Sequence, residues 1–373
     1  MPRFLHTADW QIGRQFSSFD ADTAPLLAEA RFAAVARLAQ LATEHAVDAV
    51  LVAGDVFDAQ TVSDKTIRRL FQLLAGFAGP WLLIPGNHDA ALAESVWTRA
   101  ERLQCVPANA HLLLTPQVRS FPERGFAVLP APLRQRHTYD DATAWMDAAA
   151  TPAGLVRIGL AHGSVQGLLH DGIDAANPIS PTRAASARLD WLALGDWHGV
   201  KRIDARTAYS GTPEPDRFPN NEPGHALLVD IAAPGAEPQV TQLPVARYRW
   251  RRLELALQLA SDLDAAEALL AAVQPHEVLQ LTLGGQLDWA AYQRLQAAIG
   301  AAEARARCLI VDAGALRMAP SDDDLALLHA DGYVGELLAE LRAESAASQD
   351  GAQDALALLA TALWAQEQQG AQP

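Results

Sequence analysis

The chain has 373 residues, half of them hydrophobic, and a formal net charge of −15. This composition excludes a disordered chain, and the acidic balance argues against a strong stand-alone binder of nucleic acid, which usually presents a basic face. Two cysteines, Cys105 and Cys308, exclude a disulfide framework. No signal peptide or apolar run of membrane length is recognisable, so we expect a soluble, cytoplasmic protein without a membrane span.

Strands and helices alternate in the first part of the chain. Apolar runs and their breakers predict strands at 3–7, 47–52 and 81–84, with helices at 25–44 and 63–77 between them. Pro25 falls in the first turn of its helix, where its missing N–H costs little, and Ser63 is the expected N-cap of the next helix. This alternation predicts a parallel sheet with helices on its faces.

Polar side chains follow each of these three strands. Asp9 comes just after the first strand, Asp55 after the second, and the loop Gly86-Asn87-His88-Asp89 after the third. In open α/β sheets, ligands bind at the carboxyl ends of the strands. The loop after the third strand offers a metal ligand, a proton donor and an orienting group in succession.

The next part of the chain repeats this pattern, and we expect it to have more antiparallel character. Strands are predicted at 125–129, 156–161, 191–194, 208–213 and 225–231, with a helix at 139–150. His162 follows the second of these strands, and Asp196 and His198 follow the third. The residue types that recur at strand ends are therefore those that bind metals.

Beyond residue 246 the pattern changes to a compact βαβαβ unit. Strands are predicted at 249–257, 277–283 and 307–317, with helices at 262–272 and 289–302. Two apolar-striped helices, at 323–344 and 354–367, follow and could pack internally or dock on a partner. We therefore predict three domains, at 1–245, 246–320 and 321–373, the second with a capping or substrate-positioning role.

The candidate metal ligands are all oxygen or imidazole donors: Asp9, Gln11, Asp55, Asn87, His162, Asp196 and His198. This set suits borderline-hard ions such as Mn²⁺, and the lack of Cys among the candidates argues against a structural zinc site. Sites that cleave phosphoesters with two metal ions hold the ions about 3.5–4 Å apart. Such a site needs one carboxylate that bridges both ions and further ligands on each.

The order of the motifs adds a family resemblance. The patterns Asp-x-His, Gly-Asp, Gly-Asn-His-Asp, His-Gly and Gly-His-x-His define the calcineurin-like metallophosphoesterases, and residues 6–10 and 54–58 look like their SbcD-type DNA repair exonuclease branch. The similarity spans residues 3–231. It implies a four-layer α/β/β/α sandwich with a small α+β capping domain and a helical C-terminal segment. It also implies two Mn²⁺ ions, a coiled-coil SbcC-type ATPase as partner, and a homodimer formed through the catalytic domain.

The resemblance assigns roles to the candidate residues. Asp55 would bridge the two ions. Asp9, Gln11 and His198 would serve one ion, and Asn87, His162 and Asp196 the other. A metal-bound hydroxide would attack phosphorus, His88 would protonate the leaving group, and Asp89 would orient His88.

Three positions depart from the family pattern. Gln11 and Asp196 each stand where the pattern has histidine, and Asp58 stands where some relatives have a second catalytic histidine. An amide oxygen is a poorer ligand for Mn²⁺ than imidazole, whereas Asp196 adds a carboxylate. We therefore expect a binuclear site that is harder and more anionic, with weaker occupancy on the Asp9 side.

The leading hypothesis is a Mn²⁺-dependent phosphodiesterase that acts as a DNA exonuclease or endonuclease in DNA repair with an SbcC-type ATPase. The acidic balance and the altered ligands leave open a phosphoesterase for nucleotides or other small phosphates. A third alternative is a weakly active metal-binding scaffold of the ATPase complex. The retention of His88 argues against a scaffold, which needs no acid.

Overall fold

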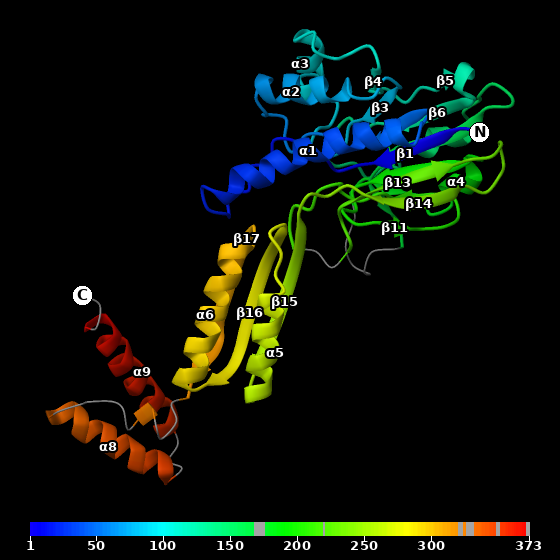
Figure 1. The fold of residues 1–373 in the computed structure, drawn as a ribbon. Helices are drawn as coiled ribbons and strands as arrows, with labels where there is room; N and C mark the ends of the chain where they lie inside the picture. The colour runs from blue at the N-terminus through cyan, green and yellow to red at the C-terminus, as the bar shows by residue number, and fades with distance from the viewer. Residues whose placement is uncertain (168–175, 219–220, 320–323, 326–331, 348–350, 371–373) are drawn as a thin grey trace. The chain divides into compact units, whose positions relative to one another are not determined.

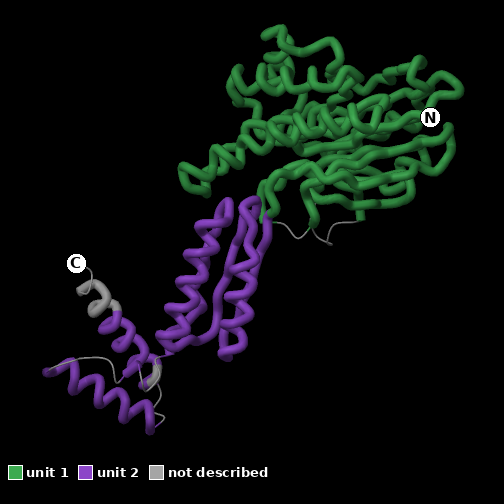
Figure 2. The backbone as a smooth tube through the Cα atoms, viewed as in Figure 1, with its two compact units in different colours: residues 1–249 green, residues 250–373 purple. Residues whose placement is uncertain are grey.

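A computed structural model describes the chain except for residues 168–175, 219–220, 320–323, 326–331, 348–350 and 371–373. The chain separates into two units, Met1–Arg249 and Trp250–Pro373 (Figure 2). The predicted three-domain division and its roles remain a prediction. No helix in the described part of the chain is both long enough and apolar enough to span a membrane.

The first unit contains two six-stranded sheets, of which the first carries the N-terminal strands (Figure 1). Its strand order is β14-β13-β1-β2-β3-β4, and β1 to β4 run parallel while β13 and β14 are antiparallel. The bounds are β1 Arg3–Thr7, β2 Ala49–Ala53, β3 Trp81–Ile84, β4 Ala110–Leu112, β13 His225–Asp230 and β14 Gln239–Pro244. The predicted parallel arrangement of the first three strands is confirmed.

Three helices accompany this sheet: α1 (Thr23–Glu44), α2 (Asp64–Leu74) and α3 (Val96–Arg102). Ser63 caps α2 as predicted, since its Oγ accepts a hydrogen bond from the N–H of Thr66 at 3.1 Å. The buried faces of these helices pack on side chains from the outer face of the sheet, among them Val50 and Val52 of β2.

The second sheet has the order β11-β12-β10-β7-β6-β5. The bounds are β5 Arg119–Phe121, β6 Phe126–Ala131, β7 Val156–His162, β10 Trp191–Gly195, β11 Lys201–Arg202 and β12 Thr207–Tyr209, with the small pair β8 Ser164–Val165 and β9 Pro178–Ile179 nearby in the chain. Strands β6, β7, β10 and β12 run parallel, and antiparallel pairing is confined to the edges β5 and β11. The expectation of more antiparallel character was wrong for the centre of this sheet, because the connections between its strands are long enough for parallel crossovers.

The two sheets pack face to face, so their central strands are buried on both sides. In β2, Ala49, Leu51 and Ala53 belong to the apolar cluster between the sheets, whereas the alternate residues face the helices. On the far side, Leu192 and Leu194 of β10 pack with residues of the short segments η2 (Ala144–Asp147) and α4 (Arg183–Ser186). The alternation produces the four layers, α/β/β/α, that the resemblance implied.

The helix predicted at 139–150 was wrong. This region forms only the single 3₁₀ turn η2, Ala144–Asp147. The carboxylate of Asp141 accepts hydrogen bonds from the N–H of Thr143 at 2.8 Å and from the N–H of Ser180 at 2.9 Å. These local and long-range bonds satisfy backbone groups outside a helix, as short polar side chains commonly do.

The second unit has a three-stranded sheet in the order β15-β16-β17, with bounds β15 Arg249–Leu257, β16 Glu277–Leu287 and β17 Cys308–Met318. Helices α5 (Ala260–Ala271) and α6 (Trp289–Arg305) share an apolar cluster with this sheet. Two further helices, α8 (Gly332–Ala346) and α9 (Ala352–Gly370), follow. The beginning of the helix predicted at 323–344 lies outside the described residues. Leu338 of α8 and Leu356 of α9 are buried in a cluster with Trp289.

One buried histidine links the two sheets of the first unit. His6 of β1 is fully buried, and its Nε2 lies 3.1 Å from the carbonyl oxygen of Leu194 in β10. Burial lowers the pKa of His6 from 6.5 to about 3, although the hydrogen bond to Leu194 opposes this shift. Between these two values the unfolded chain binds a proton that the folded chain does not, so acid favours unfolding.

We expect the free energy of unfolding to fall as the pH drops from about 6.5 to about 5, with His6 contributing up to about 1.4 kcal/mol per pH unit. His6→Gln keeps a donor for Leu194 and removes the titrating group, so its stability should fall less steeply. Urea unfolding followed by tryptophan fluorescence at several pH values measures both slopes. Equal slopes in the two proteins would contradict this assignment.

Candidate metal centre

Three buried polar side chains from the two sheets meet where parallel strands end. Asp9 follows β1, Asp55 follows β2 and His162 ends β7, and one ligand atom from each lies within 4.8 Å of the others. His162 Nε2 is 3.6 Å from Asp55 Oδ1, and His162 Nδ1 is 4.0 Å from Asp9 Oδ1. The strand ends thus assemble a buried cluster of carboxylate and imidazole groups.

The His162 ring is oriented by the backbone of the neighbouring sheet. Its Nδ1 donates a hydrogen bond to the carbonyl oxygen of Ala53 at 2.8 Å. Its Nε2 then faces three oxygens, from Asn87 at 2.9 Å, Asp55 at 3.6 Å and Asp196 at 3.8 Å. A histidine that gives one ring N–H to a carbonyl and turns the other nitrogen towards acidic oxygens is typical of metal sites.

The Asn87 amide completes this set of converging donors. Its oxygen position lies 2.9 Å from His162 Nε2 and 3.2 Å from both carboxylate oxygens of Asp55. With its NH₂ turned inward the amide donates to Asp55 and His162, and with its oxygen turned inward it can serve as a ligand to a cation. Carboxylate oxygen, amide oxygen and imidazole nitrogen in one place fit a divalent cation.

The backbone at the ligand positions adopts conformations that side chains normally avoid. Asp9, Gln11, Asp55 and Asp196 have φ values of 55°, 44°, 51° and 107°. Positive φ outside glycine costs of order 1–3 kcal/mol and clusters at functional sites. Here the loops after β1 and β2 support each other, because the N–H of Gln11 donates to the carbonyl oxygen of Asp55 at 2.9 Å.

Two glycines allow the loops to approach closely. A Cβ on Gly86 would lie 2.2 Å from Asp55 Oδ1, and one on Gly195 would lie 2.0 Å from the carbonyl oxygen of Ala53. Both contacts are far shorter than any side chain permits. These glycines therefore set how near β3 and β10 come to the Asp55 loop.

The cluster perturbs its own titrating groups. Burial raises the pKa of Asp9 to about 6, although His198 and His162 oppose the shift. Burial lowers the pKa of His162, but the carboxylates of Asp55, Asp9 and Asp196 outweigh burial and raise this pKa to about 9. The oxygens therefore favour positive charge at the position that His162 Nε2 faces.

His88 lies beside this cluster, and its orienting partner differs from the predicted one. Its Nδ1 is 2.7 Å from the carbonyl oxygen of Asp58, and its Nε2 is 4.0 Å from Asp55 Oδ2. Asp89 is fully buried, and its carboxylate instead accepts hydrogen bonds from the N–H groups of Gly86 and Phe57 at 2.7 and 3.1 Å. The carboxylate of Asp89 thus holds the backbone of its own loop and of the loop after β2, and the contact that orients the His88 ring comes from Asp58 instead of the predicted Asp89.

The remaining predicted ligands, Gln11 and His198, lie on the other side of Asp9. Gln11 Nε2 is 3.4 Å from His198 Nε2, and Gln11 Oε1 accepts a hydrogen bond from Arg14 at 3.0 Å. Their donor atoms thus face one another and Arg14. The three-residue cluster of Asp9, Asp55 and His162 does not include these two side chains.

The sequence profile of the calcineurin-like phosphoesterases matches residues 2–203, more than half of the chain. The chain belongs to this family. Its metal-ligand candidates Asp9, Asp55, Asn87, His162, Asp196 and His198 all lie inside the matched region.

Several curated relatives of the phosphoesterase are nucleases. It is 44% identical over 94 residues to the SbcD component of the SbcCD nuclease of Rhodobacter capsulatus, covering 24% of the chain and 22% of the relative. It is 26% identical over 277 residues to the DNA double-strand break repair protein Mre11 of Aeropyrum pernix, covering 68% and 64%. An uncharacterized metallophosphoesterase, YhaO of Bacillus subtilis, is 28% identical over 212 residues, covering 54% and 50%. The chain thus spans less than two thirds of each of these relatives, which support the SbcD and Mre11 branch of the family.

The structure adds residues that the sequence did not single out. Arg31 of α1 is buried and donates to the carbonyl oxygens of Trp10 at 2.6 Å and Asp9 at 3.1 Å. Asp216 is buried, and its Oδ1 is 3.3 Å from His198 Nδ1. Arg31 lies on the apolar side of the helix predicted at 25–44, and a charged residue there could have marked it as a functional candidate. The sequence around Asp216 carried no comparable signal.

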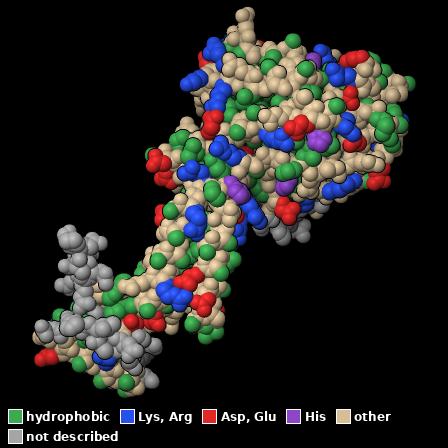
Figure 3. Space-filling view, in the orientation of Figure 1, with side chains coloured by type: hydrophobic (Ala, Val, Ile, Leu, Met, Phe, Trp, Pro, Cys, Tyr) green, Lys and Arg blue, Asp and Glu red, His purple; other side chains and the backbone are tan. Residues whose placement is uncertain are grey.

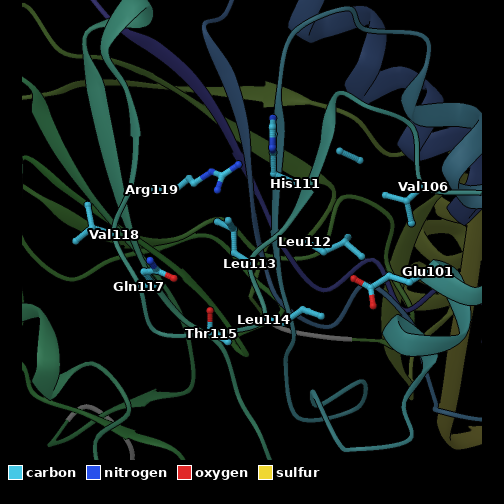
Figure 4. Close-up of a pocket in the computed structure, with 11 residues that line it drawn as sticks. Glu101, Val106, His111, Leu112, Leu113, Leu114, Thr115, Gln117, Val118 and Arg119 are labelled. Atoms are coloured by element: carbon cyan, nitrogen blue, oxygen red, sulfur yellow. The ribbon is translucent and has the colours of Figure 1, made fainter. Parts of the chain in front are cut away.

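Two of the cavities on the described surface of the phosphoesterase unit have similar volumes. One, of about 410 Å³, is lined by residues between 101 and 119, including His111 and Arg119 from β4 and β5 (Figure 4). Its lining contains none of the predicted ligands, so it does not belong to the metal centre. The other, of about 430 Å³, is lined in part by Arg14, Asp58 and Asp216 and therefore adjoins His198 and Gln11.

Replacement of Gly86 by alanine tests the placement of Asp55. The added methyl group would meet Asp55 Oδ1 at 2.2 Å and Asp55 N at 2.4 Å, so the carboxylate must move. We expect the affinity for Mn²⁺ to fall at least about tenfold, which is ~1.4 kcal/mol of binding free energy, when measured by calorimetry. Circular dichroism should show an unchanged secondary structure.

Gly300→Ala is the matched control, because a Cβ at this position in α6 meets no atom within 4 Å. It should bind Mn²⁺ as the wild type does. Unchanged affinity in Gly86→Ala would show that Asp55 takes no part in holding the ion.

Proposed function

We propose that this phosphoesterase is a Mn²⁺-dependent phosphodiesterase that cleaves DNA as an exonuclease or endonuclease. The observation that supports it most is the buried cluster of Asp9, Asp55 and His162 with the imidazole of His88 at its edge. The SbcD and Mre11 relatives support DNA as the substrate. By the same relationship we propose a role in DNA repair with an SbcC-type ATPase.

Asp9, Asp55, Asn87, His162 and Asp196 would hold the ion. A bound divalent ion would supply positive charge to the phosphoryl oxygens and lower the pKa of a water. Hydrogen bonds to the backbone orient two of these ligands. His162 donates to the carbonyl oxygen of Ala53, and the carboxylate of Asp9 accepts from the backbone N–H of Asp196 at 3.2 Å. This support keeps the ligands in place before substrate binds.

His88 would act as the general acid. Hydrolysis forms a bond from a water oxygen to phosphorus and breaks the bond to the leaving oxygen, which needs a proton. The carbonyl oxygen of Asp58 can only accept, so Nδ1 donates to it, and the imidazolium form of His88 would carry the transferable proton on Nε2, which lies 4.0 Å from Asp55 Oδ2. The side chain of His88 is 29% exposed, so it is accessible from solvent.

A small-phosphate esterase remains the second candidate. Lys and Arg side chains are interspersed with acidic ones on the face of the first unit drawn in Figure 3, and they form no single basic stripe there. The net charge of −15 agrees with this distribution. Binding of a long duplex would then require a partner protein or a small local group of basic side chains, whereas binding of a nucleotide would not.

His88→Ala tests the proposed reaction. We expect cleavage of linear duplex DNA, single-stranded DNA and bis-p-nitrophenyl phosphate to fall about 10²–10⁴-fold, with Mn²⁺ binding unchanged, because the leaving group loses its acid. His137→Ala, at an exposed position of the same unit, should cleave as the wild type does. Hydrolysis of the small diester alone would favour the second candidate, and Mn²⁺ binding without turnover would favour a scaffold.

We also propose that α8 and α9 dock the ATPase partner. They pack against each other through buried residues, yet Tyr333 and Leu358 are 77% and 73% exposed. Exposed large apolar side chains on these two helices favour a protein contact. Three further proposals stand beside it: a capping role for the β15-β16-β17 sheet, a homodimer, and a cytoplasmic location.

Tyr333→Ser combined with Leu358→Ser tests the docking surface. We expect the affinity for a purified SbcC-type ATPase to fall at least about tenfold in biolayer interferometry, because the apolar contact area is lost. Leu259→Ser is the control, since Leu259 is also exposed, at 66%, but precedes α5. Wild-type affinity in the double variant would rule out docking through these two side chains.

A further inference from the structure

Four side chains beside the metal cluster form a closed ring of polar contacts. Arg14 Nη1 lies 3.0 Å from Gln11 Oε1, and Gln11 Nε2 lies 3.4 Å from His198 Nε2. His198 Nδ1 lies 3.3 Å from Asp216 Oδ1, and Asp216 Oδ2 lies 3.3 Å from Arg14 Nη1. We call these four residues the Arg14 ring.

The chemistry of the donors fixes the direction of each contact in the ring. A guanidinium can only donate, so the Gln11 atom that faces Arg14 is its oxygen. The NH₂ of Gln11 therefore lies 3.4 Å from His198 Nε2, which accepts from it in the neutral form of the imidazole. His198 Nδ1 in turn donates to the carboxylate of Asp216. The lone pair of His198 and the amide oxygen of Gln11, the two atoms that could bind an ion, are thus both engaged by neighbours.

Two of the three departures from the family pattern are contacts of Arg14. Gln11 accepts from Arg14 at 3.0 Å, and Asp58 Oδ1 lies 3.4 Å from the same nitrogen. The third departure, Asp196, lies on the other side, with its Oδ1 3.8 Å from His162 Nε2. The three departures therefore fall into two groups. Gln11 and Asp58 contact the guanidinium of Arg14, whereas Asp196 contributes a carboxylate to the cluster at Asp55.

We propose that the phosphoesterase holds one resident divalent ion, at Asp55, and that the Arg14 ring takes the place of a second ion. The guanidinium of Arg14 then supplies the second positive charge to a bound phosphate group. Its side chain is 31% exposed and lines the cavity of about 430 Å³ that adjoins the site. This inference rests on the proposed function and replaces the binuclear site expected from the resemblance.

The number of bound ions tests the ring directly. Metal-free full-length protein is titrated with Mn²⁺ by calorimetry, and the bound ion is examined by electron paramagnetic resonance. We expect one ion per chain and the signal of an isolated Mn²⁺. Gln11→His removes the amide that engages His198 and adds an imidazole, so it should bind two ions. Gln15→His adds the same group at an exposed position nearby and should still bind one.

Two comparably tight ions in the wild type, or one ion in Gln11→His, would overturn the proposal. The role of the guanidinium is measured separately with inorganic phosphate and Mn²⁺-saturated protein. Arg14→Gln should weaken phosphate binding at least about fivefold, and unchanged binding would remove Arg14 from the phosphate site. Neither experiment uses turnover, so the absence of DNA cleavage would overturn the proposed function while leaving the ion count to be judged by itself.

Discussion

The structure depends on the convergence of buried acidic groups where the parallel strands of two stacked sheets end. Asp9 and Asp55 leave one sheet and His162 leaves the other, and their ligand atoms lie within 4.8 Å of one another. Two carboxylates at this distance in a buried place repel each other strongly unless positive charge lies between them. A protonated His162 or a bound cation provides that charge, which is why the raised pKa of His162 and the proposed metal site have the same cause.

The surrounding chain is arranged to hold this unfavourable cluster together. Buried Arg31 donates to the carbonyl oxygens of the Asp9 loop and of Glu214, so a single guanidinium joins two loops behind the site. Buried Asp89 holds the turn that presents Asn87 and His88. Strained φ values at the ligand positions persist because hydrogen bonds between the loops determine the backbone there. Each of these groups acts on the ligands through the backbone.

The site is asymmetric about Asp9. On the Asp55 side, oxygens of Asp55, Asn87 and Asp196 converge on His162 Nε2, where either a bound cation or a protonated His162 provides the positive charge. On the Gln11 side, the same kinds of atoms are satisfied by one another and by Arg14. Positive charge on that side is covalently attached to the chain, and it cannot be removed by a chelator.

The sequence by itself determined the α/β layers, the strand ends that carry Asp9, Asp55, Asn87 and His162, and the family, because hydrophobic alternation and the short motifs are local signals. The tertiary structure alone decided the partners of these residues. Gln11 meets His198 across 187 positions of sequence, and the acceptor for His88 is a backbone carbonyl that carries no sequence signal. The helix expected at 139–150 failed for the same reason, since Asp141 bonds to Ser180, 39 residues away. Contacts between distant segments are set by how the two sheets pack, and that packing decided which candidate ligands converge at Asp55 and which contact Arg14 or its neighbours.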